Sequence, residues 1–250
     1  MKRINYTGDL APSFEVLSAL QKNHLLNVPF ENLDIDNGIP IKLDTDLIRT
    51  KIVTNKRGGF CYELNGLFCE LLSSLGFKAK RISGRVWDKT NGYGAEYDHL
   101  AILVEIDGQL YLSDVGFGEF TFAPLKVETN TVQADERGDF LIDTCKVDGQ
   151  EYFRVSKIDN GLKTPEYIFS LTERALNEFS TMCQYHQTSS KSHFTIKRIV
   201  SIPTIDGRVT ITGDLLKIKK ADKIIKEYNL QNEEIFKRDL KDYFHIDLSY

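Results

Sequence analysis

The chain has 250 residues, of which 41% are apolar, which is enough for one large domain or for two to three small ones sharing a core. Its 36 acidic and 32 basic side chains give a formal net charge of −4, and no block of like charge resembles a surface that follows a phosphate backbone. We therefore expect a globular protein, not a disordered one, without nucleic acid as a partner.

The N-terminus and the cysteines indicate in which cellular compartment we expect the protein. Residues 1–10 lack the apolar run of a secretion signal, and no later stretch is long and apolar enough to span a bilayer. The four cysteines, Cys61, Cys69, Cys145 and Cys183, provide neither a disulfide framework nor a C-x-x-C pair. We expect a cytoplasmic protein with no membrane partner and no metal site. A cysteine in such a chain is usually a small core residue, so a catalytic role needs further evidence.

The first third of the chain has a helical pattern. Just after Pro12, the apolar residues Phe14, Leu17 and Leu20 recur at three-residue steps, which predicts a helix there. Further along, Asp44 is a suitable N-terminal cap for a second, short helix.

The clearest helix is expected to begin at Cys61. Its apolar stripe ends at Gly76, a residue suited to a C-terminal cap. The stripe consists of Leu64, Leu67, Phe68, Leu71, Leu72 and Leu75. At about 100° per residue, Cys61 lies roughly 50° from the centre of the stripe and Cys69 roughly 130° from it. We therefore expect Cys61 to face the protein body and Cys69 to point away from it.

The middle of the chain changes to a β pattern. Three turn dipeptides, Asp107-Gly108, Asp148-Gly149 and Asp206-Gly207, each lie between β-rich runs and predict hairpins. From about Phe194 the chain shows another hairpin.

The C-terminal part is expected to end in two charged amphipathic helices, 221–228 and 232–243. We predict an α+β protein in which a helical part, a β part and a small α/β part pack as one body. The boundaries fall at 1–77, 78–187 and 188–250.

Two glycines precede the expected helix start at Cys61. In Arg57-Gly58-Gly59-Phe60-Cys61 they let the backbone turn tightly and leave the first helical amides directed at Cys61 or at its substrate. Such amides favour negative charge, and the thiolate is the form of cysteine that attacks a carbonyl.

The hairpin at Asp107-Gly108 predicts a second group of polar residues. If these two residues form the turn, paired positions sum to 215, so His99 and Asp114 are diagonal neighbours on one face. Backbones so placed lie about 7 to 8 Å apart, a gap that an imidazole and a carboxylate can bridge. A one-residue bulge would break this register, and a surface His with a solvated Asp is the alternative.

Together these residues predict nucleophilic catalysis. A cysteine beside a histidine whose tautomer is set by an acid can form a covalent acyl intermediate. We therefore predict a triad of Cys61, His99 and Asp114. Spacing alone does not bring Cys61 to His99, because that contact depends on how the helical part packs on the sheet.

Four motifs then resemble the arylamine N-acetyltransferase family, in order and in spacing. They are Pro29-Phe30-Glu31-Asn32-Leu33, Arg57-Gly-Gly-Phe-Cys61-Tyr-Glu-Leu-Asn65, Asp98-His99-Leu100 and Ser113-Asp114-Val115-Gly116-Phe117-Gly118. The segments His186 to Phe194 and Gly207 to Thr210 are also similar, so the likeness covers nearly the whole chain.

The resemblance implies a fold and an activity. It implies an N-terminal helical bundle, a central β-barrel and a C-terminal α/β lid. It also implies acetyl transfer from acetyl-CoA to arylamines, arylhydroxylamines or arylhydrazines by a ping-pong route, with Cys61 as nucleophile, His99 as base and Asp114 as acid. The partners are thus acetyl-CoA and a small aromatic amine or hydrazine.

The resemblance also assigns residues around the triad. Glu31 and Arg57 match a pair expected to steady the cysteine loop as an ion pair, and Phe30 and Phe117 match aromatic wall positions. We add Trp87 as a further wall of the acceptor pocket, although an aromatic residue is more often plain core.

Other features leave questions open. The family often has proline where this chain has Ser190, which bears on cofactor affinity. No glycine-rich phosphate loop appears, so the residues that bind CoA cannot be named from the sequence. Three alternatives remain: a thiol amidase or peptidase, an amide synthase that closes a macrolactam, and a non-catalytic binding protein on the same scaffold.

Overall fold

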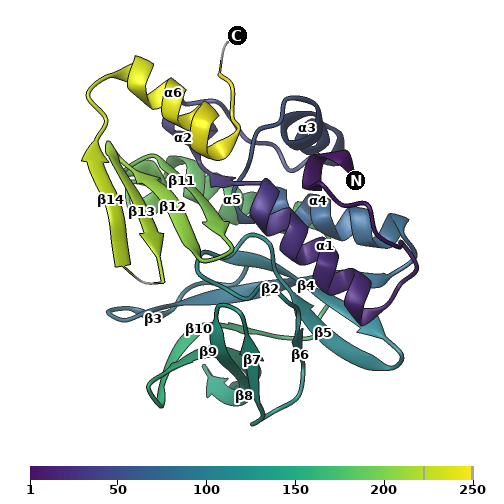
Figure 1. Cartoon of the computed structure of the whole chain (residues 1–250). Coiled ribbons are helices and arrows are strands. Elements are labelled where there is room, and N and C mark those ends of the chain that lie inside the picture. The colour runs from purple at the N-terminus through teal and green to yellow at the C-terminus, as the bar shows by residue number, and fades with distance from the viewer. Residues whose placement is uncertain (222, 249–250) are drawn as a thin grey trace.

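The computed structural model describes residues 1–221 and 223–248. Helices at the N-terminal end lie on one side of a large sheet, and a second sheet with the last helix lies beside them (Figure 1). The helices are α1 (Phe14–Asn27), α2 (Leu33–Asp36), α3 (Thr45–Arg49), α4 (Cys61–Ser74), α5 (Ser180–Thr188) and α6 (Glu233–Phe244). Shorter turns are the 3-10 turns η1 (Lys2–Ile4), η3 (Leu176–Phe179) and η4 (His193–Thr195) and the π turn η2 (Thr50–Thr54).

The strands fall into two antiparallel sheets. The five-stranded sheet has the order β1-β11-β12-β13-β14, with bounds β1 (Phe30–Glu31), β11 (Ile199–Thr204), β12 (Gly207–Thr212), β13 (Leu215–Lys220) and β14 (Lys223–Asn229). The nine-stranded sheet has the order β6-β5-β4-β2-β10-β9-β8-β7, with β3 paired to β2. Its strands are β2 (Lys78–Asp88), β3 (Gly92–Tyr93), β4 (His99–Ile106), β5 (Gln109–Ser113), β6 (Leu125–Lys126), β7 (Val132–Asp135), β8 (Gly138–Val147), β9 (Gln150–Asp159) and β10 (Leu162–Phe169).

The expected helix signals are confirmed in the first third. Asp44 caps α3 by accepting hydrogen bonds from the first backbone amides of that helix. Helix α4 begins at Cys61, and Gly76 follows its end with a φ of +90°, a conformation that favours glycine. The prediction for Cys69 is wrong, because its side chain is buried in the core between the helices and the large sheet. The leucine stripe marks one buried face, but α4 is covered on more than one side, so a position off the stripe is also enclosed.

The two edges of the nine-stranded sheet meet through a side chain. The Gln133 amide of β7 accepts from the Lys126 backbone N–H of β6 at 2.8 Å and donates to the Lys126 carbonyl at 2.9 Å. An amide side chain thus takes the place of a strand pair and closes the sheet toward a barrel. Its interior is filled by apolar residues, among them Ile82, Leu103, Leu112, Phe140, Ile142, Val155, Tyr167 and Phe169.

Two of the three predicted hairpin turns are confirmed. Asp107 and Gly108 both have positive φ, and Ile106 pairs with Gln109, as the turn type requires. Asp148-Gly149 forms the corresponding turn between β8 and β9.

The third turn lies one residue earlier than predicted. Gly207 pairs with Thr204, so the turn residues are Ile205 and Asp206 and Gly207 is the first residue of β12. A Cβ atom on Gly207 would lie 1.9 Å from the Lys219 carbonyl oxygen. The glycine is therefore explained by close approach of β13 and not by the turn.

The C-terminal part contains one of the two predicted helices. Helix α6 matches the expected 232–243, capped by Asn232, and packs its apolar side on the five-stranded sheet. The predicted helix at 221–228 is wrong: within it, residue 222 lies outside the described part, and Lys223–Asn229 form the edge strand β14. Lysines and a glutamate are typical of an exposed edge strand, and the same charges mimic a charged helix face. None of the helices in residues 1–221 and 223–248 is long and apolar enough to cross a membrane.

Candidate active site

Cys61 is positioned by two glycines and a short strand. The Glu31 backbone N–H in β1 donates to the Gly59 carbonyl at 2.9 Å, so the segment before α4 lies directly against β1. A Cβ atom on Gly58 would lie 2.1 Å from the Pro29 carbonyl oxygen, which only glycine avoids. The close approach of these backbones sets where the first residue of α4, Cys61, projects.

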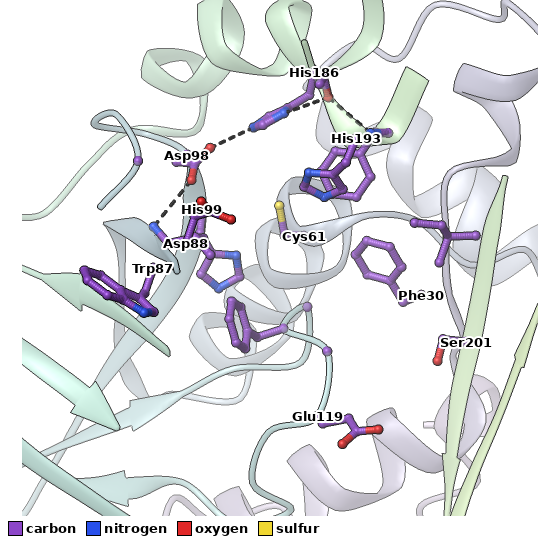
Figure 2. A pocket seen from close by; sticks show the side chains of 18 of the residues that line it. Phe30, Cys61, Trp87, Asp88, Asp98, His99, Glu119, His186, His193 and Ser201 are labelled. Carbon is purple, nitrogen blue, oxygen red and sulfur yellow. Dashed lines mark hydrogen bonds and ion pairs between the residues drawn. The ribbon is translucent and has the colours of Figure 1, made fainter. Parts of the chain in front are cut away.

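The side chain of Cys61 lies on the wall of a cavity of about 730 Å³. Figure 2 shows its sulfur and the His99 ring directed into the same cavity. Burial raises the pKa of the Cys61 thiol, the Leu100 backbone amide opposes that shift, and the carboxylates of Asp114 and Asp98 add to it. A thiolate at this position therefore needs a nearby cation, and the His99 imidazole on the same cavity wall is a group able to become one.

His99 and Asp114 meet as the hairpin register predicts. The pairs Ile102 with Ser113 and Leu103 with Leu112 each sum to 215, and no bulge interrupts them. His99 Nε2 lies 2.6 Å from Asp114 Oδ2, and both side chains are buried. The contact uses Nε2, so Nδ1 is the ring nitrogen that remains for another proton.

The Asp114 carboxylate accepts hydrogen bonds on both oxygens. Oδ2 also receives the Tyr167 hydroxyl at 3.0 Å, and the donors to Oδ1 are the Asn65 amide at 2.8 Å and the backbone amides of Gly116 at 2.9 Å and Phe117 at 3.1 Å. Burial raises the pKa of Asp114, but the charge of His99 and these hydrogen bonds outweigh burial and hold the pKa below its ordinary value. The group thus stays a carboxylate.

The sequence did not predict a role in the site for Asn65 or for Gln21. Asn65 on α4 also donates to the Leu100 carbonyl at 2.6 Å and accepts from the Val115 N–H at 2.9 Å, so one amide ties the cysteine helix to β4 and to the segment that follows β5. Gln21 on α1 accepts from the Ser113 hydroxyl at 2.7 Å. The spacing of Asn65 one turn after Cys61 was the available signal, and Gln21 had none.

The three aromatic residues named from the sequence all line the cavity, as do Cys61 and His99. Phe117 contacts the His99 ring edge-on at 5.2 Å, and Trp87 packs on Tyr93 at 4.8 Å. Phe30 lies on the far wall, beyond Cys61 (Figure 2).

The Glu31 and Arg57 pair is present. Arg57 Nη2 lies 2.8 Å from Glu31 Oε1, and Arg57 also pairs with Asp34 at 2.9 Å. Glu31 Oε2 accepts from the Leu33 N–H at 2.8 Å, which leaves the carboxylate fully engaged. These contacts join Arg57, four residues before Cys61, to β1 and α2.

A second acid and imidazole pair lies on the same cavity. His186 Nε2 on α5 is 3.2 Å from Asp98 Oδ1, and its Nδ1 is 3.3 Å from the Ser192 hydroxyl (Figure 2). Burial, followed by the charge of His186, lowers the pKa of the neighbouring His193. Asp98 directly precedes His99, but no local pattern connects it to a residue 88 positions later, because that contact is made by packing.

The cavity wall also carries cations. Lys191 and Arg208 line it, and Arg208 also borders a smaller hollow of about 360 Å³ together with Lys217 and Lys219. Within residues 1–221 and 223–248, no group of three or more His, Cys, Asp or Glu side chains could hold a metal ion.

Comparison with known proteins identifies the family. A family model described as N-acetyltransferase matches residues 13–250. An arylamine N-acetyltransferase, a pineal gland isozyme of Gallus gallus, is 31% identical over 98% of this chain and 92% of its own length. The structure of the Mycobacterium marinum arylamine N-acetyltransferase in complex with CoA is 30% identical, with a TM-score of 0.87 over 98% of this chain and 90% of its own.

A catalytic triad has been described for a third similar protein. The arylamine N-acetyltransferase of Bacillus cereus, described as having a unique Cys-His-Glu catalytic triad, is 26% identical, with a TM-score of 0.89 over 99% of this chain and 96% of its own. The matches extend over essentially the full length of the chain and agree with the arrangement of helices and sheets found here. The chain therefore belongs to the arylamine N-acetyltransferase family.

Proposed function

We propose that the protein carries an acetyl group from acetyl-CoA to an arylamine, arylhydroxylamine or arylhydrazine through an acetyl thioester on Cys61. The observation that carries this proposal is a thiol at a helix start that shares one cavity with an imidazole already paired to a buried carboxylate. That arrangement is the one required to form and resolve an acyl-enzyme.

In the first half-reaction, His99 takes the proton of Cys61 on Nδ1 while its Nε2–H donates to Asp114. The resulting thiolate forms a bond to the acetyl carbonyl carbon, and the bond from that carbon to the CoA sulfur then breaks. The backbone amides at the start of α4 stabilise the oxyanion, and the proton from His99 leaves with the CoA thiol. The high thiol pKa caused by burial makes this transfer to His99 necessary.

In the second half-reaction, the amine nitrogen attacks the thioester of Cys61 and His99 accepts the proton that nitrogen loses. The bond from carbon to sulfur breaks, and His99 gives that proton to the Cys61 sulfur, which restores the thiol. Phe30, Phe117 and Trp87 provide flat apolar surface for an aromatic acceptor. Glu31 and Arg57 act on the cysteine only through the backbone that they support.

Lys191 and Arg208 are our candidates for contacts with CoA phosphates, since both are cations on the cavity wall. The relative from Mycobacterium marinum has been described with CoA bound, which supports a cofactor site in this fold. Ser190 does not leave its loop unsupported, because the Lys191 N–H donates to the Ser189 hydroxyl at 3.2 Å and the Ser192 N–H to the Ser189 carbonyl at 3.0 Å.

The division into a helical bundle at 1–77, a barrel at 78–187 and a lid at 188–250 is likewise our proposal. Strands β2–β10 and β11–β14 fall in separate segments, which supports it. Four free cysteines support a cytoplasmic location, where thiols stay reduced, and we expect no nucleic acid among the partners.

The test is to mix the protein with acetyl-CoA alone and to map the acetylated peptide by mass spectrometry. One acetyl group on the peptide that contains Cys61 is expected, together with release of one CoA. Cys61→Ala should take up no acetyl group and lose turnover, whereas Cys145→Ala, on β8, is the matched control and should retain both. An acetyl group on another residue, or hydrolysis of amides without CoA, would contradict the proposal.

A further inference from the structure

Behind the start of α4 lies a buried cluster of charges that the two half-reactions do not use. It contains three carboxylates and two cations: Glu31, Asp34, Glu63, Lys51 and Arg57. We infer that Lys51 is a positioning residue for the Cys61 thiol, because its ammonium holds the Glu63 carboxylate against the backbone that leads into Cys61. This inference rests on the proposed role of Cys61.

Lys51 bridges carboxylates from separate parts of the chain. Its Nζ lies 2.9 and 3.0 Å from the two Glu63 oxygens and 2.8 Å from Asp34 Oδ2, and Glu31 is 3.9 Å away. Lys51 comes from the π turn η2, a rare geometry that often marks functional positions. Its side chain is 13% exposed, so the charge is largely removed from water.

Glu63 connects this cluster to the nucleophile. One of its oxygens accepts a hydrogen bond at 3.2 Å from the backbone N–H of Phe60, the residue immediately before Cys61. The same carboxylate lies against Gly59, where a Cβ atom would approach Glu63 to 2.9 Å. Glu63 therefore sets the backbone of the two residues that precede the thiol.

The charges explain why Lys51 is needed for this contact. Arg57 pairs with Glu31 and Asp34, and Lys51 is the cation that contacts Glu63 among the residues that the structure describes. Burial raises the pKa of Glu63 to about 7 even with Lys51 beside it, and Glu31 adds to the shift. Without the ammonium, Glu63 would take up a proton at neutral pH and its hold on Phe60 would weaken.

Within residues 1–221 and 223–248, Lys51 is the cation in contact with Glu63. Two other titratable side chains that interact with Glu63, Glu31 and Cys183 on α5, supply no positive charge. Glu63 raises the pKa of the Cys183 thiol, Lys51 lowers it, and Cys183 in turn interacts with Cys61. The Cys61 thiol thus depends on where Glu63 holds the Phe60 backbone, because helix-start amides that move away from the sulfur stabilise its thiolate less.

The experiment compares four variants with the wild type. They are Lys51→Met, Lys51→Arg, the double variant Lys51→Met with Glu63→Gln, and Lys42→Met, an exposed lysine that serves as the matched control. The single-turnover rate of Cys61 acetylation by acetyl-CoA is one readout. The pH profile of Cys61 alkylation by iodoacetamide, with circular dichroism to confirm folding, is the other.

Lys51→Met should slow acetylation by about tenfold or more, as is typical of a lost supporting contact, while Lys42→Met should not. Lys51→Arg should restore most of the rate. The double variant should do so too, because the neutral amide that Glu63→Gln introduces needs no counter-charge and still accepts the Phe60 N–H. In Lys51→Met the alkylation profile should shift to higher pH, and the double variant should reverse that shift.

A loss of rate in Lys51→Met that is equal at every pH, or that the double variant does not reverse, would overturn the inference and leave Lys51 with a role in folding only. Acetylation at the wild-type rate in Lys51→Met would overturn it as well. If wild-type Cys61 takes up no acetyl group, the proposed function fails instead, and the alkylation profiles still decide the role of Lys51.

Discussion

One cavity is bordered by two pairs of an aspartate with a histidine, and their surroundings differ. In the first pair the Asp114 side chain is fully buried and its contact with His99 is 2.6 Å. In the second pair Asp98 is 21% exposed and its contact with His186 is 3.2 Å. The first carboxylate receives hydrogen bonds from four donors besides the imidazole, whereas the second receives one long contact of 3.4 Å from the Val86 N–H.

The difference supports our proposal that the first pair is the catalytic one. An acid that orients an imidazole must itself be held in place and stay ionised, and dense hydrogen bonding achieves both at Asp114. The second pair joins α5 to the residue before β4, and His186 also contacts Ser192, so the pair supports this part of the cavity wall. We therefore expect chemistry to depend on the first pair, and the binding of the acceptor to depend on the second.

The largest effect is expected at the imidazoles. His99→Gln should lower the rate of Cys61 acetylation by about 10⁴-fold, since it removes the proposed acceptor of the thiol proton. His186→Gln is the matched change and should leave that rate within about tenfold of the wild type while raising KM for the amine. Single-turnover and steady-state kinetics measure the two effects. Comparable losses in both variants would refute the distinction between the pairs.

A smaller effect is expected at the acids. Asp114→Asn keeps the volume but removes the charge and favours the wrong tautomer of His99, so acetylation should fall by about 10³-fold. Asp98→Asn should change it by less than about tenfold, because that carboxylate is partly solvated. The measurement is the acetylation rate between about pH 6 and 9. Full activity of Asp114→Asn would mean that His99 needs no orienting charge.

The smallest effect is expected at Asn65, which donates a hydrogen bond to Asp114. Asn65→Leu removes a donor to Asp114 and the partners of the Leu100 carbonyl and the Val115 N–H, so acetylation should fall by about 10- to 100-fold. The free energy of unfolding should fall by about 1 to 3 kcal/mol, since buried polar groups lose their partners. Chemical denaturation gives the second value. If stability falls while the rate does not, Asn65 supports the fold and not Asp114.

Local signals in the sequence were sufficient where a short segment decides its own geometry. The turn at Asp107-Gly108 set the register that brings His99 to Asp114, because two residues with positive φ leave one way to pair the strands. The start of α4 at Cys61 was likewise predictable from the glycines before it and the leucine stripe after it. Both inferences rest on residues that are close together in the chain.

The predictions were wrong where contacts between distant segments decide the local structure. Cys69 is buried by layers on more than one side of α4, which its own helical pattern does not reveal. The strand β14 exists because β13 offers it an edge, although its charges also fit a helix. The glycine at position 207 is required by the close approach of the β13 backbone and not by a turn.

By itself, then, the sequence determined that a helix starts at Cys61, that His99 pairs with Asp114, and that the chain carries the motifs of the family. Only the tertiary structure decided that Cys61 and His99 share a cavity, that Asn65 and Tyr167 saturate Asp114, and that Lys51 meets Glu63. The reason is physical: turns and helix ends are governed by a few neighbouring dihedral angles, whereas these contacts form when whole elements pack and bury their charges.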